Sequence, residues 1–194
     1  MVRTRTFDPS TALTQAVELF ASKGYSETSM EDIVRATGVS RYGLYGTFGT
    51  KRELFEAALD RYAEGMGKQS FLRLLEPDAC FEHIRTIFAE RVEDMCCIEE
   101  NKGCLFIHTA MQLAPQDDEL RGVLQKFMKR MAKAFEVGLA SAKEQGEVRA
   151  DVDVKAAGEF LTSTMFGLAV MGRSGFPRET LLGIVESTLA SLSD

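Results

Sequence analysis

The sequence predicts an all-α protein of about nine helices. Apolar residues recur at intervals of three and four along most of the chain, which is the spacing of one face of a helix. Polar residues that cap helix N-termini, and glycines that end helices, stand at the boundaries of these stretches. The 194 residues include only 4 prolines, and no stretch alternates apolar and polar residues as a half-buried strand does.

The first fifty residues predict a compact unit of three short helices. A polar N-cap residue opens each helix, and a glycine or the end of the apolar pattern closes it. The caps are Asp8 before Pro9, Thr28 in a capping box with Glu31, and Ser40; the ends are Gly24, Gly38 and Phe48. Two short helices joined by a turn that contains glycine are typical of a helix-turn-helix.

About six further helices follow. Thr50 and Glu53 form a second capping box, which opens a helix that continues through Tyr62. The next helix is predicted to begin at Asp78, and the others are predicted over residues 104–113, 117–146, 153–173 and 177–192. The chain is therefore expected to divide into residues 1–50 and a larger helical domain, residues 51–194, with the fourth helix connecting the two.

Composition narrows the class of function. The net charge is −6, and residues 1–55 contribute +1 while residues 56–194 contribute −7. This charge balance argues against a protein that coats nucleic acid nonspecifically, but it does not exclude a small DNA-binding unit at the N-terminus. No run of 18 apolar residues is present, and no apolar segment follows the basic first six residues. The expected location is therefore the cytoplasm, without a membrane partner.

The third predicted helix has a composition that suits close contact with a binding partner. Leu44 and Phe48 share its core side, and the other side carries Tyr42, Gly43, Tyr45 and Gly46. Each glycine costs roughly 0.5–1 kcal/mol relative to alanine, so a reason for both is expected. Lys51 and Arg52 stand in the first turn of the next helix, where the helix dipole favours an external phosphate as their partner. The alternative for the helix is a connecting segment of low helix propensity. The alternative for Lys51 and Arg52 is a pair of solvated surface cations.

An ordered set of marks runs through residues 16–59, AVELFASKGYSETSMEDIVRATGVSRYGLYGTFGTKRELFEAAL. The marks are Phe20, Gly24-Tyr25, Thr28-Ser29-Met30, Ile33, Gly38-Val39-Ser40, Leu44-Tyr45, Phe48, Lys51 and Leu54-Phe55. Residues 10–60 thereby resemble the DNA-binding domain of the tetracycline-repressor (TetR) family. The resemblance implies that the third helix enters the major groove and that the protein is a dimeric, ligand-released repressor.

The resemblance also implies a set of DNA contacts. They are Thr28, Ser29, Ser40, Arg41, Tyr42, Gly43, Tyr45, Thr47 and Lys51. Within this set, Tyr45 and Lys51 resemble the residues that contact phosphates in the family. Tyr42 stands where the family commonly has a small residue, and Thr47 stands where it has Tyr or His, so the operator sequence cannot be borrowed from relatives.

The last two helices are predicted to form a subunit interface. No charged residue lies between Glu159 and Arg173, so that helix is expected to be buried on several sides. The final helix has leucines and a valine at the spacing of a helix seam. The resemblance implies a four-helix bundle between two subunits, with contacts by Phe160, Met165, Phe166, Ala169, Leu182, Val185, Leu189 and Leu192. The alternative is the ordinary core of a monomer.

Methionines and phenylalanines between residues 55 and 142 predict a pocket for a small-molecule effector, because such side chains adapt to bulky apolar ligands. The expected lining is Phe88, Met95, Cys104, His108, Met111, Phe127 and Met131. Plain core packing is the alternative for each of them. Residues 103–121 resemble a segment shared by one broad branch of the family, which does not identify the ligand.

The four cysteines leave a second sensing chemistry open. Cys80, Cys96, Cys97 and Cys104 all fall in the predicted sensor region, and Cys97 and Cys104 are the favoured candidates for a thiol that senses oxidants or electrophiles. Cys104 and His108 are four apart, which suits a shared metal, but the chain has only two histidines. No metal site and no cofactor are therefore expected.

A helical enzyme is the remaining class, and it is disfavoured. The sequence has no recognisable nucleophile–base pair, no glycine-rich phosphate loop and no paired carboxylates in a known motif. No catalytic residue is therefore predicted. The sequence predicts a homodimeric, ligand-responsive DNA-binding transcriptional regulator, with repression as the favoured mode of action and operator DNA and a small molecule as its partners.

Overall fold

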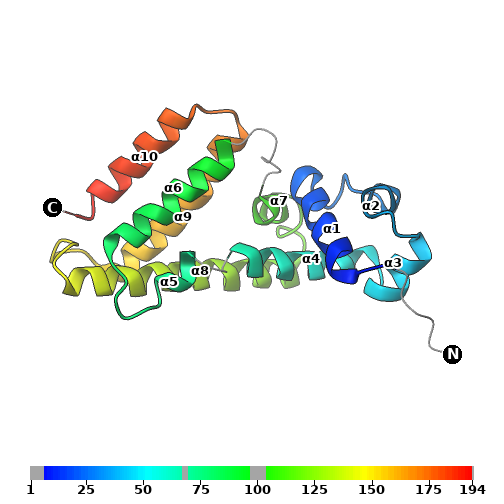
Figure 1. Ribbon diagram of the computed structural model, residues 1–194, viewed down its shortest axis with the longest axis horizontal. Coiled ribbons are helices and arrows are strands. Elements are labelled where there is room, and N and C mark those ends of the chain that lie inside the picture. Colours follow the sequence, from blue (N-terminus) through cyan, green and yellow to red (C-terminus); the bar gives the residue numbers. More distant parts are fainter. Residues whose placement is uncertain (1–6, 67–69, 97–103, 194) are drawn as a thin grey trace. The chain divides into compact units, whose positions relative to one another are not determined.

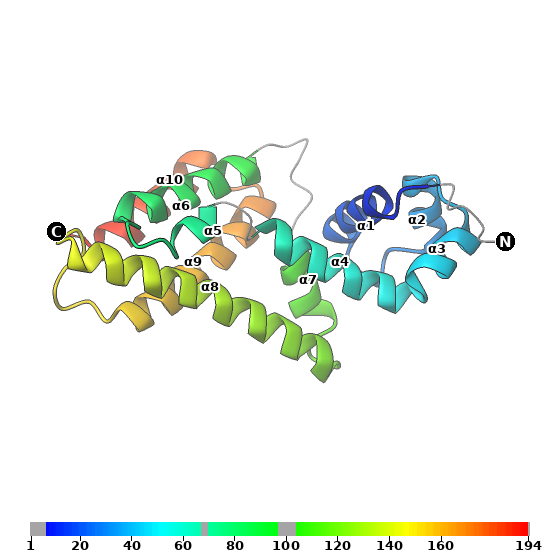
Figure 2. The same cartoon turned by 60° about the horizontal axis from the view of Figure 1, so that its bottom comes forward.

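The computed structural model describes residues 7–66, 70–96 and 104–193, and within these residues every regular element is an α-helix (Figures 1 and 2). The predicted all-α fold is therefore confirmed. The described residues form ten helices where about nine were predicted, because α5 (Ser70–Arg73) is a single turn, too short to show an apolar period.

The helices pack into two compact units. The first unit comprises residues 1–65 and 104–121, and the second comprises residues 66–103 and 122–194. The first contains α1 (Pro9–Lys23), α2 (Met30–Thr37), α3 (Arg41–Phe48), α4 (Lys51–Met66) and α7 (Leu105–Gln112). The second contains α5, α6 (Phe81–Cys96), α9 (Val154–Arg173) and α10 (Arg178–Ala190), while α8 (Asp118–Glu144) begins in the first unit and continues in the second.

The caps of the first unit follow the predicted pattern with one correction. The Asp8 carboxylate accepts hydrogen bonds from the backbone of Ser10 and Thr11 and opens α1. The capping box of α2 is formed by Ser29 and Asp32, one residue later than the predicted pair of Thr28 and Glu31. Thr28 is unavailable as a cap because it is fully buried and its hydroxyl donates a hydrogen bond to the Gly24 carbonyl at 2.7 Å.

An aromatic cluster joins α1 to α4 in the core of the first unit. The Phe20 and Phe55 rings meet edge to face with centroids 5.0 Å apart, and Tyr25 lies 4.8 Å from Phe55. Ile33 of α2 and Leu44 of α3 are also buried, so all four helices contribute to this core. Leu44 therefore anchors α3 to the core of the first unit.

The second unit is built on α6, α8, α9 and α10. Phe88 of α6 stacks on Phe135 of α8 with centroids 5.8 Å apart. The helix predicted to begin at Asp78 begins at Phe81, because the Asp78 carboxylate is held by the Arg73 guanidinium in the preceding turn at 2.6 and 2.7 Å. No helix within the described residues is long and apolar enough to cross a membrane.

Candidate nucleic-acid interface

Helix α3 is anchored on one side and open on the other. Ser40 caps its N-terminus by accepting a hydrogen bond from the Gly43 amide at 3.2 Å. Leu44 is buried against the core, whereas the Tyr42 side chain is 76% exposed and Tyr45 is 39% exposed. A short helix that is held by one buried leucine and presents two tyrosines has the form of a reading helix.

Different features of the structure explain why glycine occupies positions 43 and 46 of α3. A Cβ atom at Gly43 would lie 3.0 Å from Val39 and 3.3 Å from the Phe7 ring, so packing within the chain explains this residue. The prediction that Gly43 lies on the outward side of the helix is therefore wrong. A Cβ at Gly46 would meet none of the described atoms within 4 Å, and the residue is exposed. Gly46 therefore lacks an internal packing reason and suits close approach by an external surface.

The Arg41 side chain is oriented by two neighbours. Its guanidinium forms an ion pair with Glu31 of α2, with Nη1 and Oε1 2.7 Å apart. It also donates a weak hydrogen bond from Nη2 to the Tyr45 hydroxyl at 3.4 Å. Tyr45 and Glu31 together raise the pKa of Arg41 further above its usual value, so its positive charge is permanent. Sequence patterns carry no signal of the ion pair between Glu31 and Arg41, because contact across the turn depends on the angle between α2 and α3.

The remaining predicted DNA contacts lie at the starts of α2 and α3 and near the end of α3. Ser29 and Ser40 are exposed N-caps of α2 and α3, and Thr47 is half-buried near the end of α3. The prediction for Thr28 is corrected, because a fully buried hydroxyl bonded to the Gly24 carbonyl cannot reach DNA in this structure.

Both cations at the start of α4 have partners within the first unit. Lys51 Nζ donates a hydrogen bond to the Tyr25 carbonyl at 2.6 Å and lies 4.1 Å from the centroid of the Tyr25 ring. Partial burial lowers the pKa of Lys51 from its usual value. Arg52 is bound by the carboxylates of Glu56 and Asp117, so a phosphate is not needed to offset its charge. Lys51 retains two free N–H groups and remains the candidate for a phosphate contact.

The predicted interface residues of the last two helices separate into two groups. Met165, Val185, Leu189 and Leu192 are buried inside the second unit, which corrects their assignment to a subunit contact. The seam spacing of α10 reflects packing within its own unit, where α10 contacts α6 and α9. Phe160 is 47% exposed, and Phe166, Ala169 and Leu182 are half-buried, so these four residues are available to a partner.

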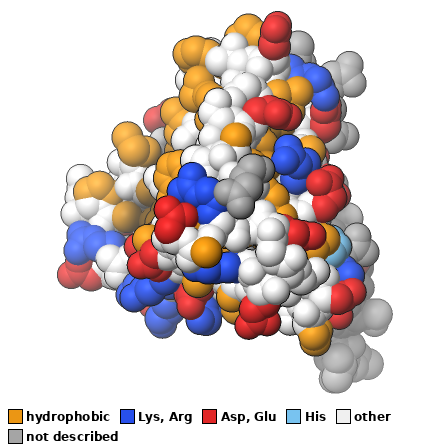
Figure 3. Space-filling view, turned by 90° about the vertical axis from the view of Figure 1, so that its left-hand side faces the viewer, with side chains coloured by type: hydrophobic (Ala, Val, Ile, Leu, Met, Phe, Trp, Pro, Cys, Tyr) orange, Lys and Arg blue, Asp and Glu red, His pale blue; other side chains and the backbone are white. Residues whose placement is uncertain are grey.

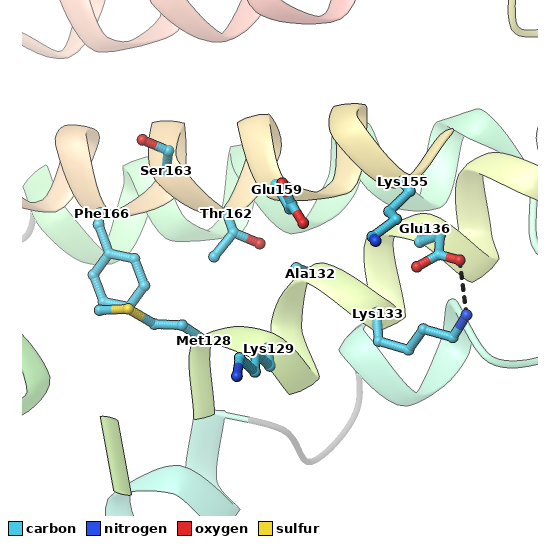
Figure 4. Close-up of a pocket in the computed structure, with 10 residues that line it drawn as sticks. All are labelled: Met128, Lys129, Ala132, Lys133, Glu136, Lys155, Glu159, Thr162, Ser163 and Phe166. Atoms are coloured by element: carbon cyan, nitrogen blue, oxygen red, sulfur yellow. Dashed lines mark hydrogen bonds and ion pairs between the residues drawn. The ribbon is translucent and has the colours of Figure 1, made fainter. Parts of the chain in front are cut away.

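The residues expected to line the effector pocket divide between the two units. Phe88, Phe127 and Met131 are buried, which places them in the core of the second unit with the half-buried Met95. Cys104, His108 and the 76% exposed Met111 belong to the first unit. A groove of about 670 Å³ opens instead between α8 and α9 (Figure 4). It is lined by Met128, Lys129, Ala132, Lys133, Glu136, Lys155, Glu159, Thr162, Ser163 and Phe166.

The cysteines give little support to a thiol sensor. Cys80, Cys96 and Cys104 are free thiols and half-buried, while Cys97 lies outside the described residues. Burial raises the pKa of the Cys104 thiol, which lowers the fraction of reactive thiolate. In the part of the chain that the structure describes, no three His, Cys, Asp or Glu side chains are grouped so that they could hold a metal ion.

The face drawn in Figure 3 carries mixed charges rather than uniformly basic ones. On the face drawn in Figure 3, Lys and Arg side chains alternate with Asp and Glu side chains, so that face carries no continuous basic stripe. Proteins that bind nucleic acid along its backbone without regard to sequence present such a stripe. The exposure of Tyr42, Tyr45 and Gly46 makes the open side of α3, together with the starts of α2 and α4, the candidate interface.

Comparison with known proteins identifies the family. A sequence model described as "Bacterial regulatory proteins, tetR family" matches residues 12–58, and one described as "Tetracyclin repressor-like, C-terminal domain" matches residues 80–175. The chain is 34% identical over 193 residues to the uncharacterized HTH-type transcriptional regulator YezE of Bacillus subtilis, covering 99% of this chain and 100% of that protein. It is 29% identical to the HTH-type transcriptional repressor ComR of Escherichia coli, covering 96% and 90%.

A solved structure agrees over the whole length. A cysteine mutant of the TetR family transcriptional regulator CifR, in complex with a 26-bp operator DNA, is 30% identical to this chain. The match covers 97% of this chain and 98% of the CifR chain, with a TM-score of 0.84. The chain belongs to the TetR family of DNA-binding transcriptional regulators.

Proposed function

We propose that this regulator is a homodimeric repressor that reads its operator through α3 and leaves it when a small molecule binds the second unit. Residues 1–50 would carry the reading surface, and residues 51–194 would carry dimerisation and effector binding. The observation that carries the proposal is the open side of α3, which presents the exposed Tyr42 and Gly46, a glycine whose Cβ position is open space. The relatives named as repressors, ComR among them, support repression.

Tyr42 is the residue best placed to read bases. Its hydroxyl both donates and accepts hydrogen bonds, and its ring presents apolar surface to a thymine methyl group. Tyr45 is exposed on the same helix, and Ser29 and Ser40 are the exposed N-caps of α2 and α3. Groups of this kind bind phosphate oxygens and fix the register of the protein on the duplex.

Replacing Lys51 by alanine is expected to weaken binding to all DNA sequences alike. The plot of log affinity against log salt concentration should become shallower by about one unit, as for one lost phosphate contact. The matched control is Lys126→Ala, which removes an exposed cation from α8 in the second unit. If Lys51→Ala lowers the melting temperature but leaves the salt slope as in the wild type, Lys51 serves only to hold the Tyr25 carbonyl.

The outer side of α9 and α10 is the proposed subunit contact. Phe160 and Val170 of α9 are 47% and 49% exposed. Phe160 also lines a groove of about 430 Å³ between α9 and α10, whose other residues are Thr180, Gly183, Ile184, Ser187, Thr188 and Ser191. These side chains are mostly small, so a partner helix can approach the backbone closely, with Phe160 as the bulky anchor.

The groove between α8 and α9 is the proposed effector site. Phe166 and Met128 point toward each other at one end of it (Figure 4). Lys129 and Lys155 line the same groove and form no ion pair with the described residues, whereas Lys133 is paired with Glu136 at 2.7 Å. An apolar end and two unpaired ammonium groups suit an organic anion with an apolar body. Because α8 belongs to both units, a ligand that binds one conformation of α8 better shifts operator affinity by linkage.

Titration with 1-anilinonaphthalene-8-sulfonate, an aromatic sulfonate, tests the groove. Phe166→Ala is expected to weaken its binding about tenfold through lost apolar burial, and Lys155→Gln should weaken it further at low salt. Lys126→Gln is the control, because Lys126 does not line the groove. Unchanged binding by both variants contradicts the site. If they change the sedimentation coefficient instead, the groove belongs to the subunit contact.

A further inference from the structure

An exposed ion pair joins the two helices of the helix-turn-helix. Glu31 is the second residue of α2, Arg41 is the first residue of α3, and Nη1 lies 2.7 Å from Oε1. The two side chains are 65% and 58% exposed. Ion pairs this exposed contribute little to stability, because water screens them and ordering two long side chains costs entropy. The main consequence of the pair is therefore the direction in which it holds the guanidinium.

Tyr45 restrains the same guanidinium from within α3. Arg41 Nη2 donates to the Tyr45 hydroxyl at 3.4 Å, and the guanidinium carbon lies 5.6 Å from the centroid of the Tyr45 ring. An arginine side chain carries five N–H donors, so these two contacts leave three free. Arg41 is thus held at two points at the N-terminus of α3, with donors to spare for a further planar acceptor.

We propose that Glu31 determines sequence specificity by holding Arg41 in the orientation that reads a guanine in the major groove. The N7 and O6 atoms of guanine accept two parallel hydrogen bonds from one arginine, and N-terminal residues of a reading helix are the ones that reach base edges. A guanidinium already held in place loses less conformational freedom on binding. The inference rests on the proposed role of α3 as the reading helix.

The charge of Glu31 distinguishes base reading from a phosphate contact. A carboxylate beside Arg41 offsets part of the attraction of its guanidinium for the DNA backbone. Glu31 would therefore weaken an Arg41 that served only as a phosphate contact. Held toward a guanine, Arg41 gains discrimination while the same carboxylate lowers the affinity for unrelated sequences. Both effects increase the ratio of specific to nonspecific binding.

A binding-selection experiment tests the inference. The wild-type protein first selects duplexes from a random-sequence library. The selected duplex then competes against duplexes that each carry one changed base pair. Arg41→Ala is expected to lose a preference for one G·C pair in each half-site, by roughly 5- to 150-fold. Glu31→Gln should lose most of the same preference and bind random-sequence duplexes more tightly than the wild type. In the Arg41→Ala background, Glu31→Gln should leave every base preference unchanged.

Glu27→Gln is the matched control. Glu27 is an exposed carboxylate of the same unit and forms no ion pair with the described residues, so its replacement removes an equal charge without touching Arg41. Glu27→Gln should retain the wild-type base preferences. Circular dichroism melts of all the variants establish that each remains folded.

The outcomes separate the inference from the proposed function. If Arg41→Ala loses the G·C preference but Glu31→Gln keeps it, Glu31 does not position Arg41 and the inference is wrong. The inference is also wrong if Glu31→Gln changes the base preferences equally in the wild-type and Arg41→Ala backgrounds. It is wrong too if Arg41→Ala keeps the G·C preference while Tyr42→Ala changes the preference at another base pair. If neither Arg41→Ala nor Tyr42→Ala alters any base preference, α3 is not the reading helix and the proposed function fails.

Discussion

Phe160→Glu is expected to separate the dimer into folded subunits. Phe160 is half-exposed in a single subunit, so glutamate there remains in water and the fold is retained. In the proposed contact the carboxylate would be buried without a partner, at a cost of about 3 kcal/mol or more, which weakens the dimer more than about 100-fold. Sedimentation velocity measures the change directly, and operator affinity should fall with it because two half-sites are no longer bound together.

Leu72→Glu is the control for that change. Leu72 of α5 is also an exposed apolar residue of the second unit, at 54%, but it lies outside the α9–α10 groove. The Leu72→Glu variant should remain dimeric. A Phe160→Glu variant that sediments as the wild-type dimer would place the subunit contact on another surface. Leu189→Glu, by contrast, should unfold the protein rather than separate subunits, because Leu189 is fully buried.

Gly158→Ala is expected to destabilise the protein by about 3 kcal/mol, near the upper end of the usual cost of overpacking. A Cβ atom there would lie 2.6 Å from the Ala132 carbonyl oxygen and 3.0 Å from the Glu136 amide nitrogen, both backbone atoms of α8. Backbone atoms cannot turn aside as a side chain does, so α8 and α9 must move apart. Denaturant unfolding measures the difference in free energy of unfolding.

Gly122→Ala, in α8, provides the matched control. No described atom lies within 4 Å of a Cβ at Gly122, and alanine is the better helix former. This variant should be stabilised by about 0.5–1 kcal/mol. If Gly158→Ala were as stable as the wild type, the close approach of α8 and α9 would not exist in solution.

Local signals in the sequence were sufficient for most helix boundaries but not for the choice between adjacent caps. Thr28 with Glu31 and Ser29 with Asp32 both satisfy the capping-box spacing. The structure selects the second pair because Thr28 is fully buried and its hydroxyl donates to the Gly24 carbonyl four residues earlier, which the capping-box spacing does not reveal. The single turn α5 was missed for a related reason, since four residues are too few to show a helical period.

Apolar spacing predicted buried faces without revealing what covers them. Val185 and Leu189 of the α10 seam are buried within the same unit, whereas Leu182 of that seam is half-buried and the exposed Phe160 lies on α9. The Met- and Phe-rich composition likewise predicted a lining, whereas Phe88 and Phe135 simply stack in the core. Sequence patterns give the faces of helices, and the pairing of those faces depends on the packing of the whole unit.

Gly46→Leu provides the most direct test of the claim that α3 enters DNA. No described atom lies near a Cβ at this position, so the variant should fold and melt at or above the wild-type temperature. The added side chain would stand between α3 and the floor of the major groove. Operator affinity, measured by electrophoretic shift with a duplex selected by the wild type, is predicted to fall to the level of random-sequence DNA, about 1,000-fold or more. A folded Gly46→Leu variant that binds this duplex as tightly as the wild type would contradict the claim.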